Sequence, residues 1–377
     1  MTPAGMKQIP LLDLQAQHKQ IREEVLAEII RVVDSQRFIL GEDVKKLEGE
    51  IASYCGTKYS IGCASGSDAL ILALMALEIK PGDEVLTTPY TFFATAGAIS
   101  RVGAIPVFVD VEEATFNLDP RLMEKTLAAH PKIRAMIPVH LFGGCADMDP
   151  IMEMAGDRGI PVIEDAAQSI GSEYKGRRAG NIGQIGCFSF FPSKNLGGYG
   201  DGGIVTTNDA MLSERLSALR VHGGKKKYYH EWIGMNSRLD ALQAAILRVK
   251  LRYLDGWSAG RAANAEHYRT RLAKLGVAVA PLTPGEYQTR HIYNQFVIRS
   301  ANRSALQAHL TAQGIGTEVY YPIPLHLQPC YAFLGHKPGD FPVSEKLAAE
   351  SLALPIHSDL PGDDIDYVCD SIRTFLA

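Results

Sequence analysis

Short apolar segments alternate with helical patterns along the first two thirds of the chain, and this alternation restricts the possible folds. The expected strands cover residues 59–63, 84–88, 105–110, 135–139 and 203–207. The expected helices cover residues 119–129, 148–155 and 209–219. A repeated strand–helix–strand order predicts a parallel sheet with helices on both faces. Ligands bind such sheets beyond the carboxyl ends of the strands, so we expect a functional site there.

The stretch from Ile160 to Thr207 contains two side chains with complementary chemistry. Asp165 follows a short apolar run, and Lys194 lies between Ser189 and the glycine-rich run 197–203. A lysine whose pKa is lowered by burial becomes a nucleophile that forms a Schiff base with an aldehyde. Pyridoxal 5'-phosphate is the common protein-bound aldehyde, and its ring nitrogen needs a carboxylate partner. We therefore predict that Asp165 and Lys194 face one such cofactor.

Both residues also have ordinary explanations. Acidic residues are frequent at strand ends, and a lysine before a glycine run is usually solvated, so either feature alone is weak evidence. The prediction rests on their occurrence together.

Other residues can complete a cofactor site. Gln168 reaches the ring hydroxyl if a helix starts after Asp165, and the hydroxyl of Ser189 suits a phosphate. Gly66 and Ser67 precede a strongly apolar helix, where free N–H groups attract an anion, although Ser67 and Asp68 also suit helix capping.

Three blocks of sequence together resemble a known family: EDAAQSIGSEYKG, FSFFPSKNLGGYGDGG and GMNSRLDALQAAIL. The family is that of the DegT/DnrJ/EryC1/StrS aminotransferases, pyridoxal-phosphate enzymes that act on nucleotide-linked keto sugars. The resemblance extends from IPLLDLQAQ near the start to YYPIPLHLQPCY near the end. It implies an α/β protein of fold type I, with a mostly parallel, seven-stranded type of sheet covered by helices, and a smaller α+β C-terminal domain.

The resemblance also implies roles for individual residues. The turn at Gly66 and Ser67 binds the cofactor phosphate, and Phe92 stacks on the ring, although an aromatic residue entering a helix is more often part of the core. Asn236 reaches the cofactor phosphate of a partner subunit, which implies an obligate two-fold homodimer. Arg238 binds the substrate phosphate, because a planar guanidinium group can pair with two phosphate oxygens at once. From the residues alone, Asn236 can equally be a helix N-cap and Arg238 a surface charge in the first helical turn.

We place a domain boundary near Gly256, giving a large cofactor-binding domain at 1–255 and a small domain at 256–377. In the small domain we expect helices at 259–275, 303–313, 341–352 and 363–375 and strands at 292–299 and 317–321. Tyr321 and His326 either line the substrate cleft or are structural residues between prolines. The N-terminal helix, expected over 14–33, can pack on either domain.

Residues 223–230 form a basic, turn-rich segment. It is either a solvated loop or a mobile lid that attracts the pyrophosphate of a nucleotide sugar.

Composition excludes several other classes. The net charge of −4 argues against nucleic-acid binding, and the six scattered cysteines, without a CxxC pair, indicate neither a zinc site nor a disulfide framework. Reduced thiols indicate the cytoplasm. No apolar stretch reaches the roughly 18 residues of a membrane span, and residues 1–14 do not resemble a signal peptide.

We therefore expect an enzyme that transfers an amino group from glutamate to a UDP- or dTDP-hexos-3- or 4-ulose. Related dehydratases carry histidine at the lysine position, so Lys194 favours transamination. The product is expected to be an amino sugar for a surface polysaccharide, such as lipopolysaccharide O-antigen, or for a glycosylated metabolite.

Two alternatives remain open. One is another enzyme of the same fold, either an amino-acid aminotransferase or a cysteine desulfurase, which needs a mobile cysteine. The other is a pyridoxal-phosphate-binding regulator, although no DNA-binding segment is evident.

Overall fold

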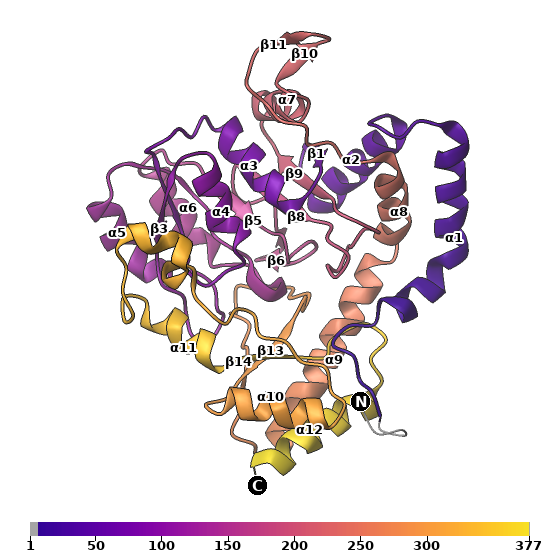
Figure 1. The fold of residues 1–377 in the computed structure, drawn as a ribbon, viewed down its shortest axis with the longest axis vertical. Helices are drawn as coiled ribbons and strands as arrows, with labels where there is room; N and C mark the ends of the chain where they lie inside the picture. The colour runs from indigo at the N-terminus through magenta and orange to yellow at the C-terminus, as the bar shows by residue number, and fades with distance from the viewer. Residues whose placement is uncertain (1–6, 377) are drawn as a thin grey trace.

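A computed structural model describes residues 7–376, which form a large sheet flanked by helices and a smaller unit at the opposite end of the molecule (Figure 1). The helices are α1 Leu14–Ser35, α2 Glu42–Cys55, α3 Gly66–Ala76, α4 Ala94–Arg101, α5 Met123–Ala129, α6 Met148–Gly156, α7 Ala210–Leu219, α8 Ala241–Leu251, α9 Leu254–Leu275, α10 Arg303–Ala312, α11 Pro342–Glu350 and α12 Gly362–Leu376. Within the described residues, none is long and apolar enough to cross a membrane. The signal-peptide prediction falls partly on residues 1–6, outside the described residues.

The large sheet combines two groups of strands. The first has the order β1-β9-β8-β5 and the second β3-β2-β4, and parallel bridges at Met136–Val162 and Val139–Asp165 join them. The strands are β1 Tyr59–Cys63, β2 Glu84–Thr87, β3 Ile105–Phe108, β4 Ile133–Met136, β5 Ile163–Asp165, β8 Ile185–Ser189 and β9 Gly203–Thr207. Over residues 7–376, this confirms the predicted seven-stranded type of sheet.

The strand β9 departs from the parallel order, since it pairs antiparallel with both β1 and β8. A parallel return needs a long crossover, usually a helix, whereas a loop lets the chain reverse directly. Residues 190–202 form such a loop. The residues on either side of the loop, Ser189 and Gly203, are paired between β8 and β9. The loop therefore leaves the sheet and returns to it at the carboxyl end of β8.

The α3 helix is buried on nearly every side and lies against the sheet. Its buried residues include Leu70, Leu72 and Leu74, and it contacts β8, β9, α4 and α7. A helix that is apolar all round belongs in a protein core, which fixes the start of α3 relative to the strand ends.

The smaller unit is built on an antiparallel sheet with the order β12-β13-β14. These strands are β12 Ala280–Pro281, β13 Phe296–Arg299 and β14 Ser351–Leu354. Its core includes residues of α9, α10 and α12 and also Ile9, which forms a bridge with Ile315. The predicted small α+β unit is therefore present, and the chain start packs on it.

Two predictions in this unit are wrong. Residues 317–321 form only a single bridge, from Glu318 to Ala353. The helix predicted at 341–352 ends at Glu350, and residues 351–354 form β14, all of whose residues are buried. Pro355 follows it, and the residue before a proline favours an extended backbone.

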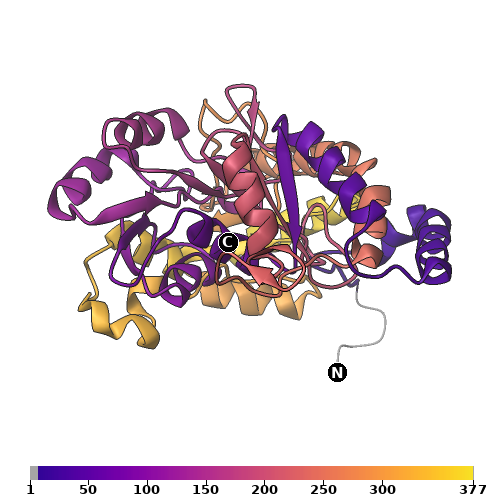
Figure 2. The same ribbon diagram turned by 90° about the horizontal axis from the view of Figure 1, so that it is seen from above.

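The helix α9 runs through position 256, so the division between 1–255 and 256–377 stays a prediction. The N-terminal helix α1 lies at an outer edge of the molecule in both views (Figures 1 and 2). Its residues Ile21 and Val25 pack with Ile246, Val249 and Trp257. It therefore packs on α8 and the start of α9.

The basic segment forms a hairpin that projects from the body (Figure 1). Its strands are β10 Gly224–Lys226 and β11 Tyr229–His230, and a second hairpin pairs β6 Glu173–Tyr174 with β7 Arg177–Arg178. Lys225 forms ion pairs with Glu214 and Glu231, so one of the three lysines is already neutralised.

Replacing Leu72 with alanine tests whether the burial of α3 in the core stabilises the fold. The side chain is fully buried, so we expect the unfolding free energy to fall by roughly 2–5 kcal/mol, as for other buried leucines. Urea unfolding of the apoprotein, followed by circular dichroism, measures it. Met211→Ala is the control, since that side chain is 76% exposed and its loss should change the free energy by less than about 0.5 kcal/mol. Equal losses of unfolding free energy in the two variants would contradict the placement of α3 in the core.

Candidate active site

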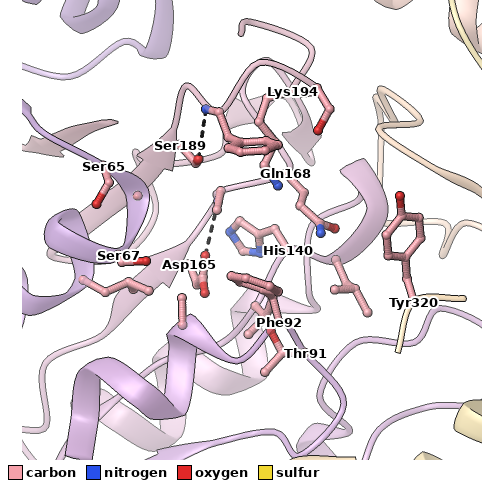
Figure 3. Close-up of a pocket in the computed structure, with 18 of the residues that line it drawn as sticks. Ser65, Ser67, Thr91, Phe92, His140, Asp165, Gln168, Ser189, Lys194 and Tyr320 are labelled. Carbon is pink, nitrogen blue, oxygen red and sulfur yellow. Dashed lines mark hydrogen bonds between the residues drawn. The ribbon is translucent and has the colours of Figure 1, made fainter. Parts of the chain in front are cut away.

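Side chains from five strand ends converge on one pocket at the carboxyl edge of the large sheet (Figure 3). Its volume is about 450 Å³. The lining residues at the ends of β1, β2, β4, β5 and β8, or directly after them, include, in chain order, Ser65, Gly66, Ser67, Thr91, Phe92, His140, Asp165, Gln168, Ser189 and Lys194. The site thus lies where a sheet of this kind is expected to bind a ligand.

The reactive amine belongs to Lys194, in the loop between β8 and β9. Burial lowers the pKa of the Lys194 amine to about 8, and the negative charge of Asp165 opposes that shift. At neutral pH, a lysine with this pKa has a far larger neutral fraction than an exposed lysine with a pKa of about 10.4. Lys194 therefore has the neutral fraction near pH 7 that a nucleophile or a proton carrier needs.

The Lys194 loop is held rigidly from several sides. A Cβ at Gly197 would lie 2.2 Å from the carbonyl oxygen of Pro192, so the turn needs glycine. On the far side, Lys250 of α8 donates a hydrogen bond to the Gly197 carbonyl, and Gln243 accepts one from the Tyr199 N–H at 2.8 Å. The Lys250 side chain is buried, which lowers its pKa to about 8.

The carboxylate of Asp165 lies at the end of β5 and is 5% exposed. It accepts hydrogen bonds from the Thr95 hydroxyl at 2.7 Å and the Ala167 N–H at 3.2 Å. Burial raises the pKa of Asp165, while Thr95, Ala167, Lys194 and His140 act in the opposite direction.

The neighbouring Glu164 points to the other face of β5, as alternation along a strand requires. Its oxygens accept hydrogen bonds from the N–H groups of residues 180, 182 and 183 and approach His140 Nε2 at 2.9 Å. Ala146 donates its N–H to His140 Nδ1, so the Nε2 atom carries the proton. Burial raises the pKa of Glu164, but the hydrogen bonds, first that of His140, outweigh burial and lower it. The pair therefore anchors the segment beneath Asp165.

The first turn of α3 faces the Lys194 loop. A Cβ at Gly66 would lie 2.6 Å from the Ser189 Cβ, so this close approach requires glycine. The N-cap is Ser65, whose hydroxyl accepts the Asp68 N–H at 3.1 Å, which corrects the expectation that Ser67 or Asp68 caps the helix. Gly66 and Ser67 lie in the first turn, where backbone N–H groups are available for an anion.

Gln168 lines the pocket although no helix follows Asp165, since residues 166–172 form turns. Its side chain accepts a hydrogen bond from the Phe142 N–H at 2.7 Å and donates one to the Tyr321 hydroxyl at 3.0 Å. Phe92 is 57% exposed and its ring centroid lies 6.0 Å from that of Tyr321. Phe92 is therefore a pocket residue and not a core residue.

His326 does not line the pocket, contrary to expectation. Its side chain is buried, 3.1 Å from Glu345 and with its ring centroid 4.7 Å from that of Phe341. Its chain neighbour Leu325 packs in a cluster with Phe108, Tyr331 and Phe341, the same phenylalanine that contacts the His326 ring.

Asn236 and Arg238 also lie outside the lining of this pocket. The amphipathic helix that residues 234–238 were expected to open begins only at Ala241, as α8. The segment instead runs beside the residues after α7, where Asn236 forms a bridge with Val221. Asn236 is therefore not an N-cap, and its side chain is exposed.

Three residues of the site, Thr91, Thr95 and Tyr320, were not predicted from the sequence. Thr91 and Tyr320 line the pocket, and Thr95 bonds to Asp165. Thr91 lies before α4, and Thr95 is the second residue of that helix. No local pattern places the two hydroxyls together, so their contact could not be predicted from the sequence.

Comparisons with known proteins agree with this geometry. The sequence model described as "DegT/DnrJ/EryC1/StrS aminotransferase family" matches residues 19–373. A "Pleiotropic regulatory protein" of Geobacillus stearothermophilus is 50% identical over 97% of this chain and 98% of its own length. The dTDP-3-amino-3,4,6-trideoxy-alpha-D-glucose transaminase of Streptomyces venezuelae is 44% identical over 98% of this chain and 97% of its own.

A solved structure is also closely similar. It is the crystal structure of S. venezuelae DesV in complex with a ketimine intermediate, with a TM-score of 0.94 and 43% identity, covering 98% of both chains. The residues of the pocket fit pyridoxal phosphate, because they combine a buried amine, a carboxylate and a helix start that approaches Ser189.

The pH dependence of Lys194 modification tests the electrostatics of the pocket. In the apoprotein, acetylation of Lys194 should reach half its maximal rate near pH 8, whereas a free lysine amine does so near about pH 10.4. Mass spectrometry of the modified peptide measures the rate.

The same measurement on Asp165→Asn supplies the control. The carboxylate stabilises the charged form of Lys194, so its removal should move the midpoint to lower pH. A midpoint that stays in place or rises would contradict the facing arrangement of the two groups.

Proposed function

The chain belongs to the DegT/DnrJ/EryC1/StrS aminotransferase family, and on this basis we propose that it transfers an amino group from glutamate to the 3-keto carbon of a dTDP- or UDP-linked hexose. The chain is an aminotransferase that uses pyridoxal phosphate. The observation that carries the proposal is the Lys194 amine, with a pKa of about 8, facing the buried Asp165 carboxylate in one pocket.

When bound, pyridoxal phosphate supplies an aldehyde that links to amines and a ring that withdraws electrons from the carbon that loses its proton. Lys194 holds the aldehyde carbon. Gly66, Ser67 and Ser189 hold the phosphate, Phe92 covers one ring face and Gln168 contacts the ring hydroxyl. Asp165 keeps a negative charge beside the ring nitrogen.

Lys194 then acts as the acid–base group. In the first half-reaction the amine of glutamate displaces Nζ from the aldehyde carbon, and the freed Nζ takes the proton from the α carbon of glutamate and gives it to that aldehyde carbon. In the second half-reaction, Nζ takes a proton from the same carbon and gives it to the former keto carbon of the sugar. A pKa of about 8 suits both tasks, because a group whose pKa is near the working pH gives and takes protons readily.

The sugar nucleotide enters beside Tyr321, and Arg238 binds its phosphate. The relative from S. venezuelae is named for a dTDP-linked sugar whose amino group is on C3, which supports a 3-keto substrate. The proposed product serves a surface polysaccharide, such as lipopolysaccharide O-antigen, or a glycosylated metabolite.

A homodimer with a shared site is part of the proposal. Asn236 is exposed and lies outside the pocket of its own chain, so its amide is free to reach a partner's cofactor phosphate. Apolar side chains such as Ile39 and Ile233 are 51% and 93% exposed in the single chain. Their exposure supports a surface that the partner subunit covers. A cytoplasmic location is supported by the free cysteines, five of the six being buried.

A pyridoxal-phosphate-binding regulator is the second candidate, since one relative is named a "Pleiotropic regulatory protein". The two candidates differ in chemistry. An aminotransferase converts its bound cofactor to the amine form when glutamate is added, whereas a regulator that only binds the cofactor leaves its absorbance unchanged.

Incubation with glutamate and a panel of dTDP- and UDP-linked 3- and 4-keto hexoses tests the proposed substrate. We expect an amino sugar nucleotide by mass spectrometry, formed fastest from a 3-keto compound. Lys194→Ala should lose both half-reactions. Turnover by that variant, or a 4-keto preference, would contradict the corresponding part of the proposal.

Mixing two inactive variants tests the shared site. Lys194→Ala lacks the amine, and Asn236→Asp repels the partner's cofactor phosphate. Random pairing of co-expressed chains in a two-fold dimer rebuilds about one quarter of the sites, which hold Lys194 of one chain and Asn236 of the other. Steady-state rates should recover to that fraction, and no recovery means that Asn236 serves its own chain.

A further inference from the structure

The carboxylate of Asp165 is the end point of a chain of two hydroxyl groups. Its Oδ2 atom lies 2.7 Å from Thr95 Oγ1, and Thr95 Oγ1 lies 2.9 Å from Thr91 Oγ1. The three residues are 5%, 0% and 2% exposed. Figure 3 shows Thr91 and Asp165 on the same side of the pocket as Phe92.

The direction of this chain follows from the number of hydrogens. An ionised carboxylate only accepts hydrogen bonds, and a threonine hydroxyl has one hydrogen. The hydrogen of Thr95 therefore points to Asp165, and its oxygen accepts the hydrogen of Thr91. Thr95 Oγ1 also lies 3.3 Å from the Phe92 carbonyl, but the shorter, charge-assisted bond to Asp165 is the stronger one.

The backbone holds both hydroxyls in place. Residues 92–95 form a turn in which the Thr95 N–H bonds to the Phe92 carbonyl at 3.2 Å, and α4 begins at Ala94. Thr91 is also next to Phe92 in the chain. The same turn that presents the aromatic ring to the pocket thus aims the hydroxyl pair at the carboxylate.

We propose that Thr91 and Thr95 form a directional hydroxyl relay that keeps Asp165 ionised and aimed at the cofactor's ring nitrogen, which makes Thr95 a positioning residue for transamination. The inference rests on the proposed role of Asp165. A protonated Asp165 no longer supplies the negative charge that holds a proton on the ring nitrogen, and the ring then withdraws electrons less strongly.

The electrostatics around Asp165 give Thr95 this influence. Burial raises the pKa of Asp165, and the hydrogen bond from Thr95 is the largest opposing contribution. Lys194, from the loop after β8, and His140, after β4, shift the pKa of Asp165 in the same direction as Thr95. Burial raises the pKa values of Cys187 in β8 and of Tyr321, and the negative charge of Asp165 adds to both shifts.

A purely structural role for Thr95 makes a different prediction. If the hydroxyl only stabilises the start of α4, its loss lowers stability and leaves the ring nitrogen protonated as before. Valine has nearly the shape of threonine without the hydroxyl, whereas serine keeps the hydroxyl. The variants Thr95→Val and Thr95→Ser therefore separate the two roles.

The test loads each variant with pyridoxal phosphate labelled with ¹⁵N in the ring and follows the nitrogen chemical shift against pH. In the wild type we expect the ring nitrogen to stay protonated through neutral pH. In Thr95→Val it should lose its proton at lower pH, and Thr95→Ser should restore the wild-type titration. Thr91→Val should shift the titration in the same direction by a smaller amount, since it weakens the relay without breaking the bond to Asp165.

Kinetics supply a second readout. For Thr95→Val we expect kcat to fall roughly 10- to 100-fold, the range for losing a hydrogen bond to a charged group. The KM for the sugar nucleotide should change by less than about 2-fold, because the relay acts on the cofactor and not on substrate binding.

Several results would overturn the relay. A ring-nitrogen titration in Thr95→Val that matches the wild type does so, and so does a Thr95→Ser variant as impaired as Thr95→Val. If Thr95→Val does not fold, as judged by circular dichroism, the Thr91→Val titration decides, and an unshifted curve rejects the relay. Asp165→Asn separates this outcome from failure of the proposed role of Asp165: if it leaves the nitrogen protonated, that role is wrong.

Discussion

The site depends on one buried carboxylate that faces one buried amine across a pocket. Each group alone is costly to bury in its charged form, and the shifts of Asp165 and Lys194 away from their ordinary pKa values express that cost. Hydrogen bonds from the surrounding backbone and from Thr95 offset part of it for Asp165. Below them, Glu164 and His140 form a second buried pair whose hydrogen bonds hold the end of β5 in position. The polar groups under the pocket therefore form a connected support.

The antiparallel direction of β9 is what places Lys194 beside this support. Because β8 returns directly through a loop, the residues at both ends of the loop are neighbours, and Lys194 is presented at the carboxyl edge beside Asp165. A helical crossover at this point would have carried the lysine across a face of the sheet. The exception to the parallel order is thus the feature that brings the two reactive groups together.

Much of this was predictable from the sequence, for identifiable reasons. The strand–helix alternation and the polar residues after β5 and β8 gave the sheet and the pocket, because periodicity and strand ends are local signals. Gln168 was correctly predicted to lie in the pocket, but the predicted reason was wrong, because turns and not a helix follow Asp165. His326 was misplaced because its burial depends on Phe341 and Glu345, which are distant in the chain. The contacts of Thr95 and Glu164 were missed, because side-chain partners across strands leave no trace in local patterns.

The fastening of the Lys194 loop to α8 has a consequence for how relatives can diverge. Lys250 and Gln243 of α8 form hydrogen bonds with the backbone of the loop, and Ser189 and Gly203, on either side of it, are paired between β8 and β9. The amine is thus carried by a loop that is tied to the rest of the protein at both ends and at its middle. New side chains in the pocket wall opposite the loop can then change which sugar is accepted while the amine stays in place.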